Sequence, residues 1–250
     1  MEKRIPNAPL ITAPPLHALN ILLVTAEMHP FARVGGMGDA VASLAAALAR
    51  RGHDVRVVMP RYGCISPQRY DATVCLEPMG VWMGTTEEWC SVWQVAATGG
   101  VSVYLIEHQR FFDRPGLYHD AAMNDYDDNP CRFGFLCRAA LQLCKDLRWT
   151  PHVVHAHDWQ TALAPAYLKL WHWNDPALSS SASVLTIHNA AYQGCYPKHH
   201  VEYLGIGWDN FTDDKFECYD RINLLKGGLY YSDMLVAVSP SFAHEITRPH

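Results

Sequence analysis

The sequence has no strong excess of charge of either sign. It contains 20 Lys and Arg against 25 Asp and Glu, so its formal net charge is −5 at pH 7 and its isoelectric point is near 6.2. It therefore lacks the basic surplus with which proteins hold a nucleic-acid backbone or an anionic membrane. It also lacks a long hydrophobic run, since apolar stretches such as residues 21–26 are far shorter than the roughly 20 residues of a membrane span. We expect no nucleic-acid partner and no membrane partner.

Closely spaced cysteine pairs are also absent. No two of the eight cysteines have the CxxC spacing of a zinc ribbon or a thioredoxin-type pair, and eight in 250 residues are too few for a disulfide scaffold. Several fall on apolar helix or strand faces, where cysteine behaves as a small hydrophobic residue. We predict a reducing compartment and a structural role for all eight: Cys64, Cys75, Cys90, Cys131, Cys137, Cys144, Cys195 and Cys218.

The composition is that of a globular domain. Hydrophobic residues make up 49% of the chain and charged residues 18%, which is enough apolar material for a core. The first 18 residues contain several prolines and no periodicity, so residues 1–18 are predicted to be a flexible leader, without the apolar run of a signal peptide. The chain stops soon after a predicted helix at 239–247, which suggests a domain taken from a longer protein.

Strand and helix patterns alternate along the chain. Residues 20–26 and 54–59 read as strands around a helix that ends near Gly52, and such βαβ units are parallel. Three β-rich stretches at 72–83, 87–97 and 101–106 are separated by glycines, as in hairpins. The later pattern predicts helices at 129–147, 159–171 and 220–231 and strands at 152–155, 183–187 and 234–238. The fold class is therefore α/β, a doubly wound, mainly parallel Rossmann-like sheet with a β-hairpin insertion.

Polar residues follow four of these strands. Because the carboxyl ends of parallel strands share one edge of a sheet, we expect their side chains to form one site. Glu27, His29 and the loop 33–39 follow the strand at 20–26, and His155, His157, Asp158 and Trp159 lie at the end of the strand at 152–155 or just after it. His188, Asn189, Tyr192 and Gln193 follow the strand at 183–187, and Ser239 and Ser241 follow the strand at 234–238.

The glycine-containing loop 33–39 is not a dinucleotide fingerprint, because the third glycine of Gly-x-Gly-x-x-Gly would fall on Val41. Its small residues still place backbone N–H groups at a helix N-terminus, where an anion is stabilised. Arg33 would add a bidentate phosphate donor. The residues of the loop therefore indicate anion binding. The alternative interpretation is an ordinary strand-to-helix turn with Asp39 in the first turn of the helix.

Two histidines and an acidic segment raise the question of metals. His155 and His157 could be ligands, but the hydrolase pattern HxHxDH fails at the following residues and no HExxH occurs, so hydrogen bonds to backbone are the alternative. The segment 125–129 resembles the start of a calcium loop but lacks its glycine and its final glutamate. Capping of the next helix by Asp128 or Asn129 explains that segment better, although it leaves Tyr126 unexplained.

Asp158 is the carboxylate that we expect to be functional. It opens a helix beside Trp159, an aromatic residue of the kind that packs on sugar rings. A glycosidase-like pair of Asp158 with Glu27 is a weaker alternative, because the sequence gives no separation between the two carboxylates.

Several segments together resemble the N-terminal half of bacterial glycogen synthases and plant starch synthases over residues 19–248. They are ILLVTAEM (21–28), RVGGMGD (33–39), DRPG (113–116), VHAHDW (154–159), TIHNAAYQG (186–194), LKGGLYYSD (225–233) and AVSP (237–240). The resemblance implies a GT-B architecture and transfer of glucose from ADP-glucose to the non-reducing end of an α-1,4-glucan, with retention and without a metal or other cofactor.

The resemblance also implies roles for single residues. The family's phosphate-side Lys-x-Gly-Gly-Leu loop falls on Arg33, Gly35, Gly36 and Met37, and Asp39 falls beside the nucleotide. The glucose and acceptor cleft would be lined by six residues, of which His188, Asp158 and Glu27 are the expected catalytic set; the others are Tyr126, Trp159 and Asn189. His188 would contact the transferred sugar, with its backbone carbonyl near the anomeric carbon, and Asp158 would stabilise the developing positive charge.

Two departures from the family shape the functional hypothesis. Arg33 replaces the usual lysine, and a planar fork is not equivalent to a point charge. We expect the family's C-terminal nucleotide-binding domain to be absent, so that residues 19–250 would be the acceptor-side domain alone. We expect a half-enzyme that is inactive by itself, either a fragment or the partner of a separate C-terminal half, in the cytoplasm or in a plastid if it comes from a plant. The alternatives are a non-catalytic α-glucan-binding module that uses Tyr126 and Trp159, and a metal-dependent hydrolase at His155 and His157.

Overall fold

A computed structural model describes residues 17–96 and 99–248. The leader predicted at 1–18 lies almost wholly outside the described residues. The strands are β1 (Asn20–Val24), β2 (Asp54–Pro60), β3 (Thr73–Met83), β4 (Thr86–Ala96), β5 (Ser102–Glu107), β6 (Val153–His157), β7 (Ala182–Ile187), β8 (Cys195–Pro197), β9 (Glu217–Cys218), β10 (Arg221–Asn223) and β11 (Met234–Ala237). The helices are α1 (Met37–Arg50), α2 (Gln109–Phe112), α3 (Asn129–Asp146), α4 (Asp158–Thr161), α5 (Leu163–Leu170), α6 (His200–Leu204), α7 (Leu224–Tyr231) and α8 (Pro240–Ile246), with 3₁₀ turns η1 (Pro67–Tyr70) and η2 (Trp208–Asn210).

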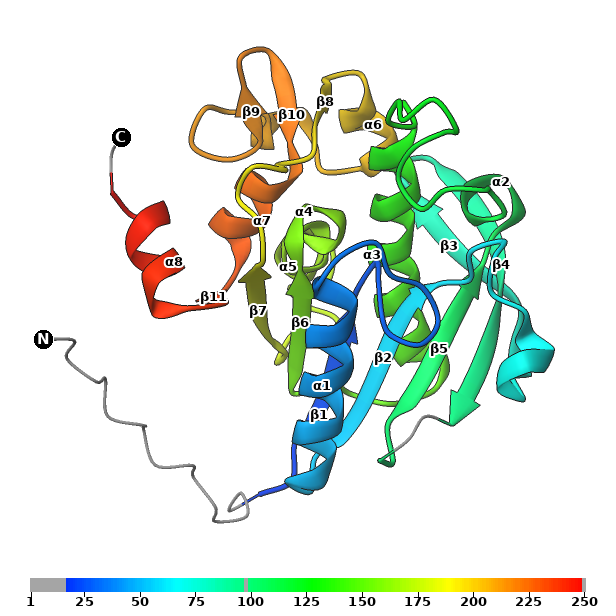
Figure 1. The fold of residues 1–250 in the computed structure, drawn as a ribbon. Helices are drawn as coiled ribbons and strands as arrows, with labels where there is room; N and C mark the ends of the chain where they lie inside the picture. The colour runs from blue at the N-terminus through cyan, green and yellow to red at the C-terminus, as the bar shows by residue number, and fades with distance from the viewer. Residues whose placement is uncertain (1–16, 97–98, 249–250) are drawn as a thin grey trace, which may run out of the picture.

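The described residues form an eight-stranded sheet in the order β11-β7-β6-β1-β2-β5-β4-β3 (Figure 1). The strands from β11 to β5 pair in parallel, and only β4 and β3 are antiparallel. The predicted doubly wound, mainly parallel fold is confirmed. The strand order reverses at β1, because β2 lies on one side of β1 and β6 on the other, and ligands of such sheets bind at this switch point.

The hairpin insertion is β3 and β4, which extend the sheet at one edge (Figure 1). The third β-rich stretch, predicted as part of the hairpins, instead becomes β5, which pairs in parallel with β2 and antiparallel with β4. Its central residues, Val103 to Ile106, are fully buried or nearly so, as in a strand covered on both faces. The insertion is therefore joined to the parallel core through β5.

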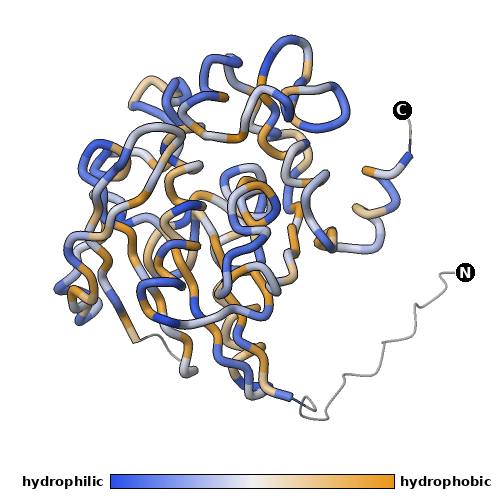
Figure 2. The backbone as a smooth tube through the Cα atoms, turned by 180° about the vertical axis from the view of Figure 1, so that it is seen from behind, coloured by the Kyte–Doolittle hydropathy of each residue, from blue (hydrophilic) through white to orange (hydrophobic). Residues whose placement is uncertain are grey.

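Helices cover both faces of the sheet. α1 lies on one face, while α3, α5 and α7 pack side by side on the other (Figure 1). The α7 packing needs glycines, since a Cβ at Gly228 would lie 2.5 Å from Cβ of Ala162, and one at Gly227 would lie 1.8 Å from the Phe216 ring. Hydrophobic backbone positions concentrate along the strands and hydrophilic ones along the loops (Figure 2). No helix in the described part of the chain is both long and apolar enough to cross a membrane.

Two predicted helices differ from the structure. The helix expected at 159–171 is divided at Ala162 into α4 and α5, and Pro165 has no N–H with which to bond the carbonyl of residue 161. The helix expected at 220–231 begins only at residue 224, because residues 221–223 form β10 in a small sheet with β8 and β9. Asn223 ends this strand and caps α7 by accepting the N–H of Lys226 at 2.9 Å.

Candidate active site

A cavity of about 800 Å³ opens where β1, β6 and β7 end, at the switch point of the sheet. The residues that follow each of these strands line it, together with the start of α1 and the segment before β8. The residues that line it include Glu27, Gly35, Gly36, Tyr118, Asp158, Trp159, Gln160, His188, Asn189, Tyr192, Gln193 and Cys195. The predicted convergence of strand ends into one site is therefore present for three of the four strands, and Val238 adds an apolar contact from the fourth.

Glu27 is buried, with 4% of its surface exposed, yet it borders this cavity. Its Oε2 accepts the N–H groups of Val34 at 2.6 Å and Gly35 at 3.3 Å, and its Oε1 accepts the hydroxyl of Tyr118 at 2.5 Å. A buried carboxylate needs such donors, because burial without them is costly. Glu27 thus holds the glycine loop against the strand end. It already accepts the N–H groups of Val34 and Gly35, two of the loop N–H groups that we predicted to bind an anion.

Asp158 adopts a left-handed backbone conformation, with φ of +56°, directly after β6. Its Oδ1 accepts the backbone N–H of His188 at 2.6 Å and of Asn189 at 3.3 Å, which ties the end of β6 to the end of β7. Asp158 is 8% exposed. Burial raises the pKa of its carboxyl, although the two N–H groups oppose this rise. Backbone strain at a cavity wall is typical of a functional residue.

His188 lines the cavity beside Asp158, and its ring contacts a second histidine. Nε2 of His188 lies 3.1 Å from Nδ1 of His157, which is buried. Behind it, the ring of His155 stacks on that of His157 at 4.4 Å, and its Nε2 lies 2.7 Å from Oγ1 of Thr186. The alternative of backbone hydrogen bonds for the His155 and His157 side chains is therefore wrong, since both rings contact side chains.

The glycine loop carries its two charged residues outside the cavity lining. Arg33 and Asp39 are both about half exposed and form an ion pair, with 2.6 Å between Nη1 and Oδ2. Gly35 and Gly36 do line the cavity, and space is open around the position of a Cβ at either residue. A phosphate near this loop would have to compete with Asp39 for the guanidinium of Arg33.

The aromatic residues do not lie as the sequence suggested. Trp159 borders the cavity but is only 7% exposed, because its ring packs edge-on against Phe133, tilts against Tyr196 and covers Gly194. Tyr126 does not line the cavity. Two guanidinium groups lie over its ring, that of Arg114 at 4.7 Å and that of Arg132 at 4.9 Å from the ring centroid. Neither side chain is an open platform for a sugar ring in this structure.

Sequence reasoning missed Tyr118. It is 9% exposed, lines the cavity, and donates its hydroxyl to Glu27, and burial and this carboxylate raise its pKa well above the usual range. No strand end or helix cap marked it in the sequence, because it lies in an irregular segment between α2 and α3. Its closeness to the cavity depends on the folding of that segment, which the sequence pattern does not specify.

Other predicted residues have structural partners. The Ser239 hydroxyl caps α8 by accepting the N–H of Phe242, and Ser241 contacts it at 3.1 Å; neither lines the cavity. Asp128 precedes α3 without capping it, and its carboxylate instead binds the guanidinium of Arg114 at 2.6 and 2.8 Å. His29 lies outside the cavity, 3.9 Å from Asp39.

The cysteines are all free thiols. Cys90, Cys137 and Cys144 are buried, as the structural prediction requires, but Cys64 and Cys195 are exposed. These two are therefore not packed as small hydrophobic residues, and a structural role for them stays a prediction. Cys195 even borders the cavity.

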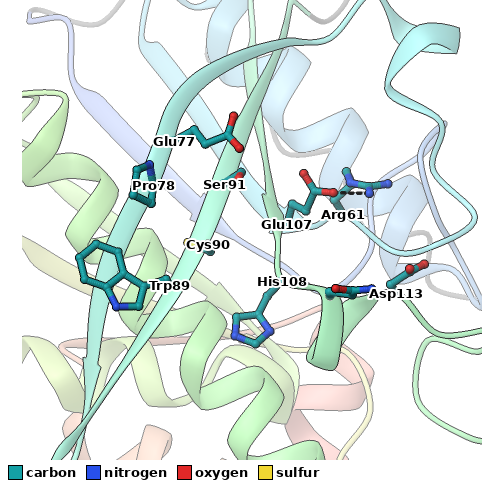
Figure 3. Close-up of a pocket in the computed structure, with 10 residues that line it drawn as sticks. Arg61, Glu77, Pro78, Trp89, Cys90, Ser91, Glu107, His108 and Asp113 are labelled. Atoms are coloured by element: carbon teal, nitrogen blue, oxygen red, sulfur yellow. Dashed lines mark hydrogen bonds and ion pairs between the residues drawn. The ribbon is translucent and has the colours of Figure 1, made fainter.

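A second hollow, of about 470 Å³, lies between the hairpin and the end of β5 (Figure 3). Arg61 and Glu107 face each other there and form an ion pair, so most of their charge is neutralised within the protein. None of the predicted site residues lines this hollow. Among the residues described, no group of three or more His, Cys, Asp and Glu is arranged to hold a metal ion.

Comparison with known proteins agrees with this arrangement. Residues 20–250 match the family model of the starch synthase catalytic domain. The chain belongs to this family. The resemblance found in the sequence is therefore confirmed.

Members of the starch synthase family are similar to the chain over nearly its whole length. A glycogen synthase of Treponema denticola is 46% identical over 92% of the chain, and glycogen synthase 1 of Geobacter sulfurreducens is 44% identical over 92%. The catalytic domain of starch synthase IV from Arabidopsis thaliana, bound to ADP and acarbose, superimposes with a TM-score of 0.83 at 30% identity over 92% of the chain. The matches cover only 46–47% of these longer proteins, so the chain spans about half their length.

Proposed function

We propose that this chain is the acceptor-side half of an ADP-glucose-dependent glucan synthase. In this proposal, the assembled enzyme transfers glucose from ADP-glucose to the non-reducing end of an α-1,4-glucan, with retention and without a metal or cofactor. The observation that carries the proposal is the meeting of Glu27, Asp158 and His188 at one cavity in a chain of the starch synthase family. The solved relative was bound to ADP and acarbose, a pairing consistent with these substrate classes.

The geometry suggests how these residues would act. Breaking the bond to the diphosphate leaves positive charge on the sugar, and a fixed carboxylate at the cavity wall stabilises that charge. Asp158 is held in place by two backbone N–H groups, so it need not reorganise during the reaction. Burial lowers the pKa of His188, so its ring is neutral near pH 7 and does not oppose the developing charge. The backbone carbonyl of His188 would lie near the anomeric carbon.

The glycine loop would face the diphosphate. Glu27 already occupies the N–H groups of Val34 and Gly35, so the first turn of α1 is the part of the loop that would meet an anion. Arg33 would exchange its contact with Asp39 for a phosphate oxygen. Glu27 itself would keep the loop at the cavity and, through Tyr118, hold the acceptor side of the cleft.

A second half would be needed to close this site, and we propose that it covers β11. This edge strand and the residue after it expose apolar side chains: Met234 is 60% exposed, Leu235 50% and, just beyond the strand, Val238 51%. An uncovered apolar patch of this kind marks an interaction surface. The relatives have about twice the length of this chain, so they contain a segment that could supply the cover. A cytoplasmic location, or a plastid one in a plant, belongs to the same proposal.

The experiment joins residues 1–250 to the downstream half of the Treponema denticola relative and measures transfer of labelled glucose from ADP-glucose to glycogen. We expect transfer by the fusion and little or none by residues 1–250 alone, since a half site cannot exclude water. Asp158→Ala in the folded fusion should lower the rate by roughly 100-fold or more, the scale of lost electrostatic stabilisation. Equal transfer by the lone chain, or an unchanged rate in Asp158→Ala, would contradict the proposal.

The two alternatives receive little support from the site. A glucan-binding module would need Trp159 and Tyr126 on an open face, whereas the first is 7% exposed and the second has two guanidinium groups over its ring. Retardation of residues 1–250 in a glycogen-containing gel tests this module directly. For a metal-dependent hydrolase, His155 and His157 stack on each other instead of converging on one point.

A further inference from the structure

His188 in the cavity wall and the two histidines behind it include a buried nitrogen without a partner. Nε2 of His157 has no hydrogen-bond partner, and His157 is 1% exposed. The hydroxyl of Thr161 accepts the backbone N–H of His157 at 2.6 Å and donates to its carbonyl at 2.8 Å, so this residue has little freedom to move. The other ring nitrogen, Nδ1, lies 3.1 Å from Nε2 of His188.

Both rings are neutral near pH 7. Burial lowers the pKa of His157 and of His188, and the neighbouring carboxylates Asp158 and Glu27 only partly oppose this for His188. The third ring, His155, has a pKa lowered to about 4 by burial, so it adds no positive charge at neutral pH. A neutral imidazole carries its single hydrogen on one of its two nitrogens. The contact between the rings therefore has one donor and one acceptor.

The unpartnered nitrogen decides which ring donates. If Nε2 of His188 donated, the hydrogen of His157 would have to sit on its own Nε2, a buried N–H without an acceptor. Buried N–H groups without a partner are rare, and under-satisfied acceptors are less so. The hydrogen of His157 therefore belongs on Nδ1, and Nε2 of His188 accepts it. The hydrogen of His188 is then on Nδ1, which has no protein partner among the described residues.

We propose that His157 is a positioning residue that holds His188 in the Nδ1–H tautomer. His188 then presents an uncharged N–H donor on a ring that lines the cavity, suited to an oxygen of a bound sugar. A neutral donor can bind a hydroxyl without repelling positive charge on the sugar ring. The relevance to catalysis rests on the proposed function, but the tautomer is a property of the chain without substrate.

The test is a long-range ¹H–¹⁵N spectrum of residues 1–250 with ¹⁵N-labelled histidine, at about pH 7.5 and without ligand. Loss of signals in His188→Gln and in His157→Asn assigns the two rings. We expect both rings to show a protonated Nδ1 and a bare Nε2. A hydrogen on Nε2 of His188 would overturn the proposal. Because no transfer is measured, failure here is distinct from failure of the fusion assay.

Variants of His157 and His155 separate positioning from folding. His157→Phe removes the donor, so the nitrogen signals of His188 should move toward values averaged over both tautomers. His157→Asn keeps an N–H donor near the position of Nδ1 and should retain the wild-type His188 pattern. His155→Phe changes the ring that stacks on His157 but forms no hydrogen bond with His188. This variant should therefore leave the His188 pattern unchanged. An unaltered pattern in folded His157→Phe would contradict the role, and if this variant fails to fold, the wild-type and His157→Asn spectra decide.

Discussion

Replacing Asp158 by Ala and by Asn should have very different effects on the stability of residues 1–250. Ala removes the acceptor of the His188 N–H, which lies at 2.6 Å, and of the weaker Asn189 contact at 3.3 Å. A buried N–H without its acceptor costs about 1–3 kcal/mol. The backbone at φ of +56° adds about 1 kcal/mol for Ala, whereas Asn tolerates this conformation as Asp does.

These contributions give a destabilisation of roughly 2–4 kcal/mol for Asp158→Ala. At about 2–4 °C per kcal/mol for a domain of this size, the melting temperature should fall by roughly 5–15 °C. Asp158→Asn keeps an acceptor oxygen and should stay within about 1 kcal/mol of the wild type, since the charge assistance that it loses is offset by the cost of burying the charge that it avoids. Urea unfolding followed by circular dichroism measures both differences.

The pH dependence of the Asn variant provides a second check. Burial raises the pKa of Asp158 in the folded chain, so the ionised carboxylate lowers folded stability. This loss is absent below the ordinary aspartate pKa of 3.8 and is complete once the pH exceeds the raised folded value. The stability of Asp158→Asn relative to wild type should therefore increase with pH. Equal unfolding free energies for the Ala and Asn variants would refute this account of the β6–β7 junction. A stability of Asp158→Asn relative to wild type that decreases with pH would also refute it.

Further changes test other parts of the structure. Gly194→Ala combines φ of +66° with a Cβ 2.6 Å from the Trp159 ring, so it should lower the unfolding free energy by roughly 2–4 kcal/mol in the same urea assay. Gly35→Ala has open space around its Cβ and should lower it by under about 1 kcal/mol. Wild-type stability should fall as pH drops from 6.5 toward 4, because the unfolded chain protonates His155 and the folded chain, with a pKa of about 4, does not; an equally steep fall in His155→Phe would contradict this. In the active fusion, Arg33→Ala should raise the KM for ADP-glucose by roughly 10-fold, and Arg33→Lys should raise it by less. Stability should change little, because the exposed Arg33–Asp39 pair contributes under about 1 kcal/mol. A thiol reagent should modify Cys64 and Cys195 rapidly in the native chain and Cys137 only after unfolding.

Much of the fold was predictable because strands and helices leave local patterns. The strand predictions at 20–26, 54–59 and 183–187 hold to within a few residues, since short apolar runs reflect burial in a parallel sheet. The helix predicted at 220–231 was too long because residues 221–223 form β10, which pairs with the adjacent β9 and with β8, a strand well before it in the sequence. Pairing between distant segments leaves no local signal.

The sequence by itself determined the family, the sheet and which strand ends carry polar residues, because motif identity and periodicity are properties of contiguous residues. Only the tertiary structure decided what those residues touch. It paired Arg33 with Asp39, covered Trp159 and brought Tyr118 to Glu27. It also joined Asp158 to the backbone after β7 and left one nitrogen of His157 without a partner. Apart from the local Arg33–Asp39 pair, these contacts join segments that are remote in the chain, and residue spacing does not encode the distance between such segments.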